Sequence, residues 1–167
     1  DGFISAMHYR AKKTAKQIIK MIDLSGARSL IDIGAGSGAY SIEIANRFPE
    51  MHVSAFDLPS VVPIMKGYIN GEGLSDRINI IAGDYKTSKF DGKYDIVFLS
   101  QILHSNSIWE NIDLAKKAYE SLNYGGKIVI QEMILDDSRT EPTHASLFSI
   151  NMLVATKSGD CYPKSDM

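Results

Sequence analysis

The chain has 167 residues, of which 44% are hydrophobic and 23% charged, and its formal net charge is −2. This composition is typical of a globular domain that builds its own core, and it excludes a strongly basic nucleic-acid-binding surface. No apolar run approaches the ~18 residues of a membrane span, the first residues do not form a signal peptide, and the single cysteine excludes an internal disulfide. We therefore predict a reduced, cytoplasmic protein with no nucleic-acid partner, no membrane partner and no cysteine-built metal centre.

The first segment is predicted to be an amphipathic helix over residues 3–22. Its apolar side chains share one face, and its lysines lie off that face. The apolar stripe consists of Ala11, Ala15, Ile18 and Ile22. The dipeptide Ser25-Gly26 ends the helix, so we divide the chain into an N-terminal helix, 1–25, and the domain on which it packs, 26–167.

A predicted buried strand, Ser29–Ile33, leads into three glycines at alternate positions and then into a helix. The glycines are Gly34, Gly36 and Gly38, and Asp32 comes two residues before the first of them. In this arrangement backbone amides and a helix N-terminus face a ligand, and glycine lets the backbone turn sharply and approach it closely. The dinucleotide fingerprint is G-x-G-x-x-G, so the G-x-G-x-G spacing here disfavours an NAD-type oxidoreductase without excluding it.

The second predicted strand, His52–Phe56, ends at Asp57. A carboxylate at this place, about 20 residues past the glycine turn, can accept hydrogen bonds from both hydroxyls of a ribose. Asp57 therefore supports a nucleoside-containing cofactor but does not choose between cofactor classes. The next helix is expected to begin at Leu58-Pro59 and to run to about Ile69.

Three further strands and two further helices are predicted in the second half of the chain. The strands are Arg77–Ala82, Asp95–Ser100 and Lys127–Met133. One helix begins with the capping box Ser107-x-x-Glu110, and the other runs from Pro142 to about Thr156. Because the last helix is apolar almost all round, we expect it to be buried.

Strands that alternate with helices favour an α/β fold, a Rossmann-like, doubly wound parallel sheet with helices on both faces. Open sheets of this kind bind ligands at the carboxyl ends of their strands. His104 follows the fourth predicted strand and Glu132 lies near the end of the fifth, so both are expected at that edge.

Several segments resemble class I S-adenosylmethionine-dependent methyltransferases, and within them the small-molecule O-methyltransferases of the caffeate and hydroxyindole type. In family order and at family-like spacing, they are Asp32-Ile33-Gly34, Phe56-Asp57-Leu58-Pro59, Gly83-Asp84, Ile102-Leu103-His104 and the stretch 123–132. The resemblance covers nearly the whole chain. It implies S-adenosylmethionine as cofactor, S-adenosylhomocysteine as its product, no metal, and a small, aromatic acceptor with a hydroxyl group.

The resemblance also implies roles for individual residues. His104 is expected to be the general base that takes the proton from the acceptor hydroxyl, and Glu132 is expected to orient it. The implied cofactor-binding residues are Asp32, Gly34, Gly36, Gly38, Asp57, Leu58, Asp84, Tyr85 and Ser100. The implied acceptor-pocket residues are Phe3, Met7 and Met152.

Family members have further parts that are not seen in this chain. Their sheet has two more strands than the five predicted here, so the class I methyltransferase fold is expected to be truncated and the domain 26–167 to be incomplete at its C-terminus. They form homodimers through an N-terminal winged-helix domain, which is not seen before Asp1. We therefore expect the full-length protein to be a homodimer.

The sequence departs from the family pattern in two places. The family's Asp-Trp after the base is replaced by Ser105-Asn106, and a second family carboxylate falls near Cys161. These departures leave the acceptor open. The alternatives are methylation of a nitrogen, a carbon or a carboxylate, and a cofactor-binding module without catalysis. The remaining histidines have no comparable context, and we interpret them as structural or surface residues; they are His8, His52 and His144.

Overall fold

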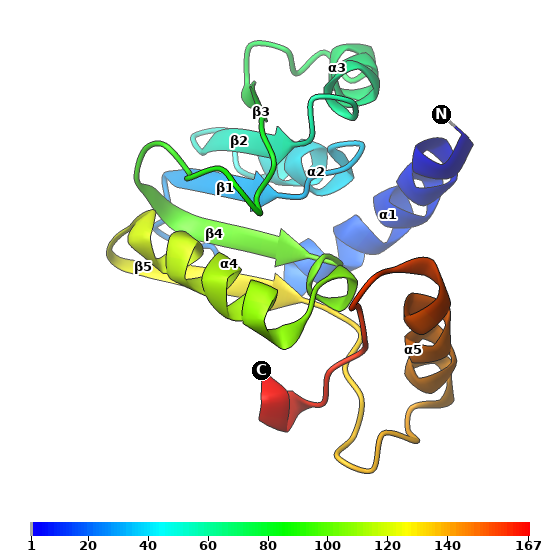
Figure 1. The fold of residues 1–167 in the computed structure, drawn as a ribbon. Coiled ribbons are helices and arrows are strands. Elements are labelled where there is room, and N and C mark those ends of the chain that lie inside the picture. Colours follow the sequence, from blue (N-terminus) through cyan, green and yellow to red (C-terminus); the bar gives the residue numbers. More distant parts are fainter. Residues whose placement is uncertain (1) are drawn as a thin grey trace.

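A five-stranded parallel sheet with the order β3-β2-β1-β4-β5 forms the centre of the protein (Figure 1). The computed structural model describes residues 2–167, with their side chains from Ala6 onward. The strands are β1 (Ser29–Ile33), β2 (His52–Asp57), β3 (Ile78–Ala82), β4 (Tyr94–Ser100) and β5 (Leu122–Gln131). Every neighbouring pair of strands is parallel, which confirms the predicted α/β class.

Helices cover both faces of the sheet, as the sequence predicts. On one face lie α1 (Gly2–Met21), α2 (Ala39–Arg47) and α3 (Val62–Gly71), and on the other lies α4 (Ile108–Glu120) (Figure 1). Side chains alternate along β1: Leu30 belongs to the core under α1 to α3, whereas Ile31 and Ile33 belong to the core under α4. The strand is apolar on both faces because both faces are covered.

The carboxyl ends of the strands meet at one edge of the sheet, which we call the carboxyl edge. Ile33 of β1 lies beside Phe56 of β2 and Leu99 of β4. Ser100 of β4 lies beside Gln131 of β5. The chain runs outward from β1 to β3 and then crosses to β4, so the strand order reverses between β1 and β4. Ligands of open α/β sheets bind outside such a reversal.

The predicted start of α4 is confirmed, and that of α3 is wrong. At α4, the Ser107 hydroxyl accepts a hydrogen bond from the Glu110 amide at 3.3 Å, and the Glu110 carboxylate accepts one from the Ser107 amide at 2.7 Å. This reciprocal pair is the predicted capping box. In contrast, α3 begins at Val62 and not at Leu58-Pro59, because the carbonyl of Leu58 first accepts the amide of Val61 in a turn.

Strand β5 begins earlier than predicted, at Leu122 instead of Lys127, and α4 already ends at Glu120. The reason is pairing with β4. The carbonyl of Ser121 accepts a hydrogen bond from the amide of Tyr94 at 2.9 Å, so the ladder between the strands starts directly after the helix.

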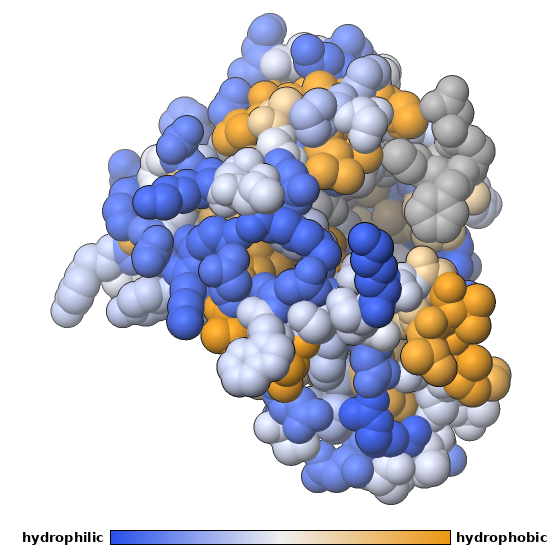
Figure 2. Space-filling view, viewed as in Figure 1, coloured by the Kyte–Doolittle hydropathy of each residue, from blue (hydrophilic) through white to orange (hydrophobic). Residues whose placement is uncertain are grey.

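The last helix, α5 (Thr143–Ala155), is not buried all round, and this expectation is wrong. Figure 2 shows an apolar patch over α5, where four large side chains are each more than 60% exposed. These are Leu147, Ile150, Leu153 and Val154. The reason is that α5 lies beyond the carboxyl edge and packs on the turn after β4, so one of its sides meets no other described residue. Between residues 2 and 167, no helix has both the length and the apolar character that a membrane crossing requires.

Candidate active site

The glycine turn after β1 has a backbone conformation that favours glycine. The φ angles of Gly34, Gly36 and Gly38 are 73°, 59° and 78°, in the left-handed region where a side chain causes strain. The amide of Gly34 donates to the carbonyl of Phe56 at 2.9 Å, which joins the turn to β2. A Cβ on Gly36 would meet nothing within 4 Å. Gly36 thus presents bare backbone to open space, whereas Gly34 faces the side chain of Ile102 and Gly38 faces α3.

Asp57 ends β2 and reaches across to the glycine turn. Its Oδ2 accepts a hydrogen bond from the amide of Gly36 at 2.6 Å, and its Oδ1 accepts one from the amide of Leu58 at 2.7 Å. Burial raises the pKa of the Asp57 carboxyl, and the two amide hydrogen bonds act against that shift. A carboxylate has about four acceptor positions, so acceptor capacity remains for the hydroxyls of a ligand.

Asp32 lies beneath the glycine turn and not on its open side. It is 1% exposed, and its Oδ2 accepts a hydrogen bond from Oγ of Ser41 in the first turn of α2, at 2.7 Å. Burial raises the pKa of the Asp32 carboxyl from 3.8 to about 7, although the Ser41 hydrogen bond opposes the shift. Asp32 therefore joins β1 to α2 behind the turn, and its contact with a cofactor stays a prediction.

Replacing Asp32 by Asn is expected to stabilise the fold at alkaline pH and to change little near pH 4. Between 3.8 and about 7 the folded carboxyl binds more protons than the unfolded one, so the free energy of unfolding falls as pH rises through this window. Asp32→Asn keeps an acceptor for Ser41 and has no charge to bury, so its gain at pH 8 is on the order of 2 kcal/mol.

The measurement is denaturant unfolding of the wild type and Asp32→Asn from pH 4 to 9. The exposed Asp76 provides the control, because Asp76→Asn changes a charge without burial. A stability difference for Asp32→Asn that stays constant across this pH range would show that the buried carboxyl does not titrate as the geometry predicts.

The loop after β3 carries the next two candidate residues, Asp84 and Tyr85. Oδ1 of Asp84 accepts a hydrogen bond from the amide of Lys86 at 2.9 Å, which shapes the loop. The side chain of Tyr85 packs against the core on the α4 face, and its hydroxyl lies 3.0 Å from Oδ1 of Asn106. The ring of Tyr85 is thus held at its base by packing and at its tip by a hydrogen bond.

Leu58 and Ser100, also expected to contact the cofactor, differ in exposure. Leu58 is 41% exposed, whereas Ser100 is 8% exposed and donates to Oε1 of Gln131 at 2.7 Å. The same oxygen of Gln131 accepts the hydroxyl of Tyr40 at 3.2 Å. Gln131 is a residue that the sequence interpretation missed, and its place at the end of β5, beside the end of β4, is the signal that pointed to it.

His104 and Glu132 form a hydrogen-bonded pair at the carboxyl edge. Nδ1 of His104 lies 2.9 Å from Oε1 of Glu132. The pair forms because His104 lies in a 3₁₀ turn directly after β4 and Glu132 directly follows β5, the neighbouring strand. The side chains are 11% and 1% exposed, respectively, so the pair is largely shielded from water.

The surroundings of the pair determine which ring nitrogen carries the proton. Oε2 of Glu132 accepts hydrogen bonds from the backbone amides of Leu103 at 3.0 Å and His104 at 3.4 Å. Oε1 also accepts a hydrogen bond from the amide of Met133 at 2.9 Å. A carboxylate only accepts hydrogen bonds, so the proton of a neutral imidazole lies on Nδ1, and Nε2 carries the lone pair. Phe148 of α5 meets the His104 ring edge-on, with centroids 4.9 Å apart.

The three residues expected in the acceptor pocket lie on the first and last helices. Met152 is buried on α5, the helix that also carries Phe148. Met7 lies on α1 and is 36% exposed. Phe3 falls outside the residues whose side chains the structure describes. Their role in acceptor binding stays a prediction.

Two residues near the site, His8 and Gly159, lie close to other segments without a clear signal in the sequence. Nδ1 of His8 on α1 lies 2.8 Å from Oγ of Ser37 in the glycine turn, and its ring stacks on Tyr68 of α3 with centroids 3.7 Å apart. A Cβ on Gly159 would lie 2.3 Å from the carbonyl oxygen of His104. Gly159 therefore allows the chain to pass close to the His104 turn.

Residues 2–165, nearly the whole chain, match the family model of the O-methyltransferase domain. The chain belongs to this family. It is 35% identical over 156 residues to 3-hydroxy-5-methyl-1-naphthoate 3-O-methyltransferase of Streptomyces sahachiroi, a match that covers 93% of this chain and 45% of the relative. It is 32% identical over 153 residues to L-tyrosine C(3)-methyltransferase of Streptomyces lavendulae, a match that covers 90% and 41%. The chain thus spans less than half the length of these two curated relatives.

A solved structure of human N-acetylserotonin methyltransferase in complex with S-adenosylmethionine has the same O-methyltransferase fold. The TM-score is 0.87 at 26% identity, and the match covers 98% of this chain and 46% of that chain. The predicted resemblance to S-adenosylmethionine-dependent O-methyltransferases is confirmed, and so is the class I methyltransferase-like fold.

The carboxyl edge of this O-methyltransferase domain fits S-adenosylmethionine on the observations above. Gly36 leaves open space where any other residue would place a Cβ. Asp57 lies beside that space, because its carboxylate accepts a hydrogen bond from the amide of Gly36. Further acceptor positions of the carboxylate remain free there. A carboxylate there suits the hydroxyls of a ribose.

Cys161 lies near the position where the O-methyltransferase pattern has a second carboxylate, and its surroundings are apolar. The side chain is fully buried and belongs to a small apolar cluster with Leu135 and Ala145. Burial, with the nearby charge of Glu132 as a smaller cause, raises the pKa of the thiol to about 11. Cys161 therefore stays neutral and packs as a small apolar side chain. The carboxylate that contacts His104 is Glu132.

Proposed function

We propose that this domain, within the protein that contains it, transfers a methyl group from S-adenosylmethionine to a hydroxyl of a small aromatic acceptor, with His104 as the general base. The observation that carries the proposal is the 2.9 Å contact between Nδ1 of His104 and Oε1 of Glu132. The contact lies at the same edge of the sheet as the glycine turn and Asp57.

The chemistry requires alignment and the removal of one proton. The bound cofactor supplies a methyl group activated on a positively charged sulfur, so the protein has to align the acceptor oxygen and accept its proton. A free phenol has a pKa of about 10 and an imidazole one of about 6.5, a mismatch of roughly 5 kcal/mol. A carboxylate beside the imidazole and a positive charge beside the phenol both reduce this mismatch.

The proposed step gives each residue of the pair one task. Nε2 of His104 takes the hydroxyl proton while the acceptor oxygen forms its bond to the methyl carbon. The bond from that carbon to the sulfonium sulfur breaks at the same time, its electron pair stays on the sulfur, and S-adenosylhomocysteine is the leaving group. Glu132 holds Nδ1 and faces the positive imidazolium that results, as the carboxylate does in a Ser-His-Asp triad. The proton leaves to solvent after the methylated product departs.

The cofactor side of the proposal uses residues with two different placements. Asp57 accepts hydrogen bonds from the ribose hydroxyls of S-adenosylmethionine, and the glycine turn contacts the methionine part of that molecule. Asp84 and Tyr85 bind its adenine. Asp32 and Ser100 are buried, so we propose that they act from beneath through their hydrogen bonds to Ser41 and Gln131. Leu58 contributes apolar contact beside Asp57. On the acceptor side, the proposed pocket residues are Phe3, Met7 and Met152.

A second candidate function is methylation of a ring carbon. It is favoured by the similarity to an enzyme named L-tyrosine C(3)-methyltransferase. Loss of the hydroxyl proton from a phenol makes both the oxygen and the adjacent ring carbon nucleophilic, so one base serves either outcome. The position of the acceptor relative to the activated methyl group then decides which atom is methylated.

The deciding experiment incubates the intact protein with labelled S-adenosylmethionine and a panel of hydroxyaromatic acceptors. NMR of the product distinguishes an oxygen-bound from a carbon-bound methyl group. Calorimetric titration with S-adenosylhomocysteine and with NAD tests the cofactor, and we expect only the former to bind. Binding of S-adenosylhomocysteine without transfer to any member of the panel would favour a non-catalytic module or a nitrogen or carboxylate acceptor.

Three further expectations stay predictions. They are the homodimer, the cytoplasmic location, and the division into an N-terminal helix, 1–25, and a methyltransferase domain, 26–167. Size-exclusion chromatography with light scattering on the intact protein tests the first of them.

A further inference from the structure

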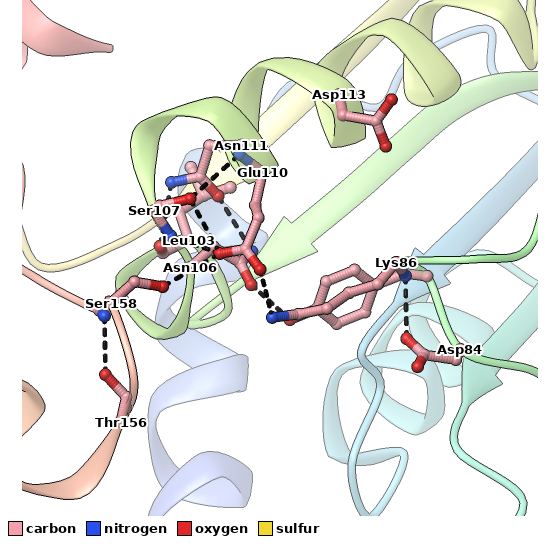
Figure 3. A network of polar contacts seen from close by, with 12 residues as sticks. Asp84, Lys86, Leu103, Asn106, Ser107, Glu110, Asn111, Asp113, Thr156 and Ser158 are labelled. Carbon is pink, nitrogen blue, oxygen red and sulfur yellow. Dashed lines mark hydrogen bonds and ion pairs between the residues drawn. The ribbon is translucent and has the colours of Figure 1, made fainter.

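A continuous chain of hydrogen bonds joins the loop after β3 to the carboxylate of Glu132. The hydroxyl of Tyr85 lies 3.0 Å from Oδ1 of Asn106, and Nδ2 of Asn106 lies 3.0 Å from Oδ1 of Asn111. Nδ2 of Asn111 donates to the carbonyl of Leu103 at 3.0 Å. The amide of Leu103 donates to Oε2 of Glu132 at 3.0 Å. Figure 3 shows the middle of this chain, where Leu103, Asn106 and Asn111 lie together at the start of α4.

The direction of these hydrogen bonds is set by one backbone group. The carbonyl of Leu103 only accepts, so Asn111 directs its NH₂ group to it and its oxygen to Asn106. Asn106 then directs its NH₂ group to Asn111 and its oxygen to Tyr85, whose hydroxyl is the donor. Burial raises the pKa of the Tyr85 hydroxyl, which keeps it protonated and able to donate. Rotation of the Asn106 amide would leave its buried polar atoms unpaired.

Asn106 is the centre of this chain and is fully buried. Its backbone carbonyl accepts a third hydrogen bond, which the hydroxyl of Tyr162 donates at 2.5 Å. It is also one of the two residues at which the sequence departs from the family's Asp-Trp pattern. The departure therefore replaces a large aromatic side chain by one that links three segments through hydrogen bonds.

Ion pairing fixes the same loop to α4. Nζ of Lys86 lies 2.8 Å from Oε1 of Glu110, and Nζ of Lys117 donates to the carbonyls of Tyr85 and Lys86 (Figure 3 shows the Lys86–Glu110 pair). These contacts are partly exposed and hold the loop in place. The part-buried hydrogen bonds of Asn106 and Asn111 are the part that continues to the His104 turn.

We propose that Asn106 and Asn111 are positioning residues that couple the cofactor side of the site, at Tyr85, to the base side, at His104. The assignment of these two sides rests on the function proposed above. Ligand binding that favours the observed position of Tyr85 also favours the observed positions of Asn106 and Asn111. It thereby favours the observed position of Leu103 and of the turn that carries the base. If the two ends are coupled in this way, loosening the hydrogen bonds at the base end weakens ligand binding at the Tyr85 end.

The test breaks the series of hydrogen bonds at its Tyr85 end and at its Asn111 end. The affinity of the intact protein for S-adenosylhomocysteine is measured by calorimetry. Asn111→Ala is expected to weaken binding about three- to tenfold, although Asn111 lies at the base end of the chain. Tyr85→Phe keeps the ring, removes the donor and is expected to cause a similar loss. The double variant is expected to lose no more than about twofold beyond either single variant, because both changes break the same chain.

Tyr94→Phe is the matched control. Tyr94 is as buried as a core side chain, and its hydroxyl donates to the carbonyl of Asp91 at 2.9 Å, away from Asn106 and Asn111. This variant should leave the affinity unchanged. A second readout follows the ¹⁵N signals of the His104 ring. S-adenosylhomocysteine is expected to shift them in the wild type and to shift them much less in Tyr85→Phe, which a purely local role of the hydroxyl would not produce.

Unchanged affinity in Asn111→Ala would overturn the coupling, as would fully additive losses in the double variant. These outcomes are independent of turnover. A protein that transfers no methyl group but shows non-additive losses would refute the proposed function and support the coupling. A protein that transfers methyl groups normally but shows additive losses would support the function and overturn the coupling.

Discussion

His104→Gln is expected to lower the single-turnover rate of methyl transfer about 10²- to 10⁴-fold, the range for loss of a general base. The change is selective because glutamine still offers an NH₂ group to Glu132 but has no basic nitrogen for the acceptor proton. Because glutamine keeps the contact with Glu132 and the hydrogen bonds of the turn remain, the affinity for S-adenosylhomocysteine should stay within about twofold. The measurement is rapid-quench transfer from labelled cofactor at saturating concentrations.

His144→Gln is the matched control, because His144 is an exposed histidine on α5. Its rate should equal that of the wild type. Glu132→Gln should fall between the two, since the imidazole remains while its charged partner is lost. If His104→Gln retains a rate within about threefold of the wild type, the acceptor is deprotonated in another way or is not a hydroxyl.

Asp57→Ala is expected to weaken binding of S-adenosylhomocysteine about 30- to 1000-fold. The proposed loss is two ribose hydrogen bonds to a charged acceptor, about 2–4 kcal/mol in total. The substitution also removes the acceptor of the Gly36 amide at 2.6 Å, so the glycine turn loses its link to the end of β2. Calorimetric titration of the intact protein measures the change directly.

Two variants separate the contributions to this loss. Asp57→Asn keeps one acceptor for the Gly36 amide and should bind more tightly than Asp57→Ala. Asp76→Ala removes an exposed carboxylate that precedes β3, at the other end of the sheet, and should bind like the wild type. Wild-type affinity in Asp57→Ala would remove this residue from the proposed site.

The sequence predicts the sheet, and the common edge at which His104 and Glu132 lie, for the same physical reason. The contact between the two side chains is implied by the family resemblance. Buried parallel strands leave long apolar runs, and residues that follow such strands gather at one edge. The position of Asp32 follows from the same strand geometry. Side chains alternate along a strand, so Asp32 lies on the face of Leu30 and not on that of Ile31. Its place under α2 follows from that alternation.

Other features depend on contacts that no local pattern encodes. The composition of α5 indicates an apolar helix but does not tell which side is covered, and the structure leaves Leu147 and Leu153 exposed. The close approach of Gly159 to His104 depends on how the chain returns past the turn after α5 has ended at Ala155. The stacking of His8 on Tyr68 joins two helices that are distant in sequence.

The way Glu132 holds both the ring and the backbone of its neighbour has a consequence for the entropy of the reaction. The carboxylate binds Nδ1 and the amide of His104, and it binds the adjacent amide of Leu103 as well. The imidazole therefore loses its rotational freedom when the chain folds, before any acceptor arrives. Ordering a free side chain at the moment of binding typically costs about 0.5–1.5 kcal/mol. That cost is absent from the encounter with the acceptor, so the ordering needed there is that of the acceptor itself.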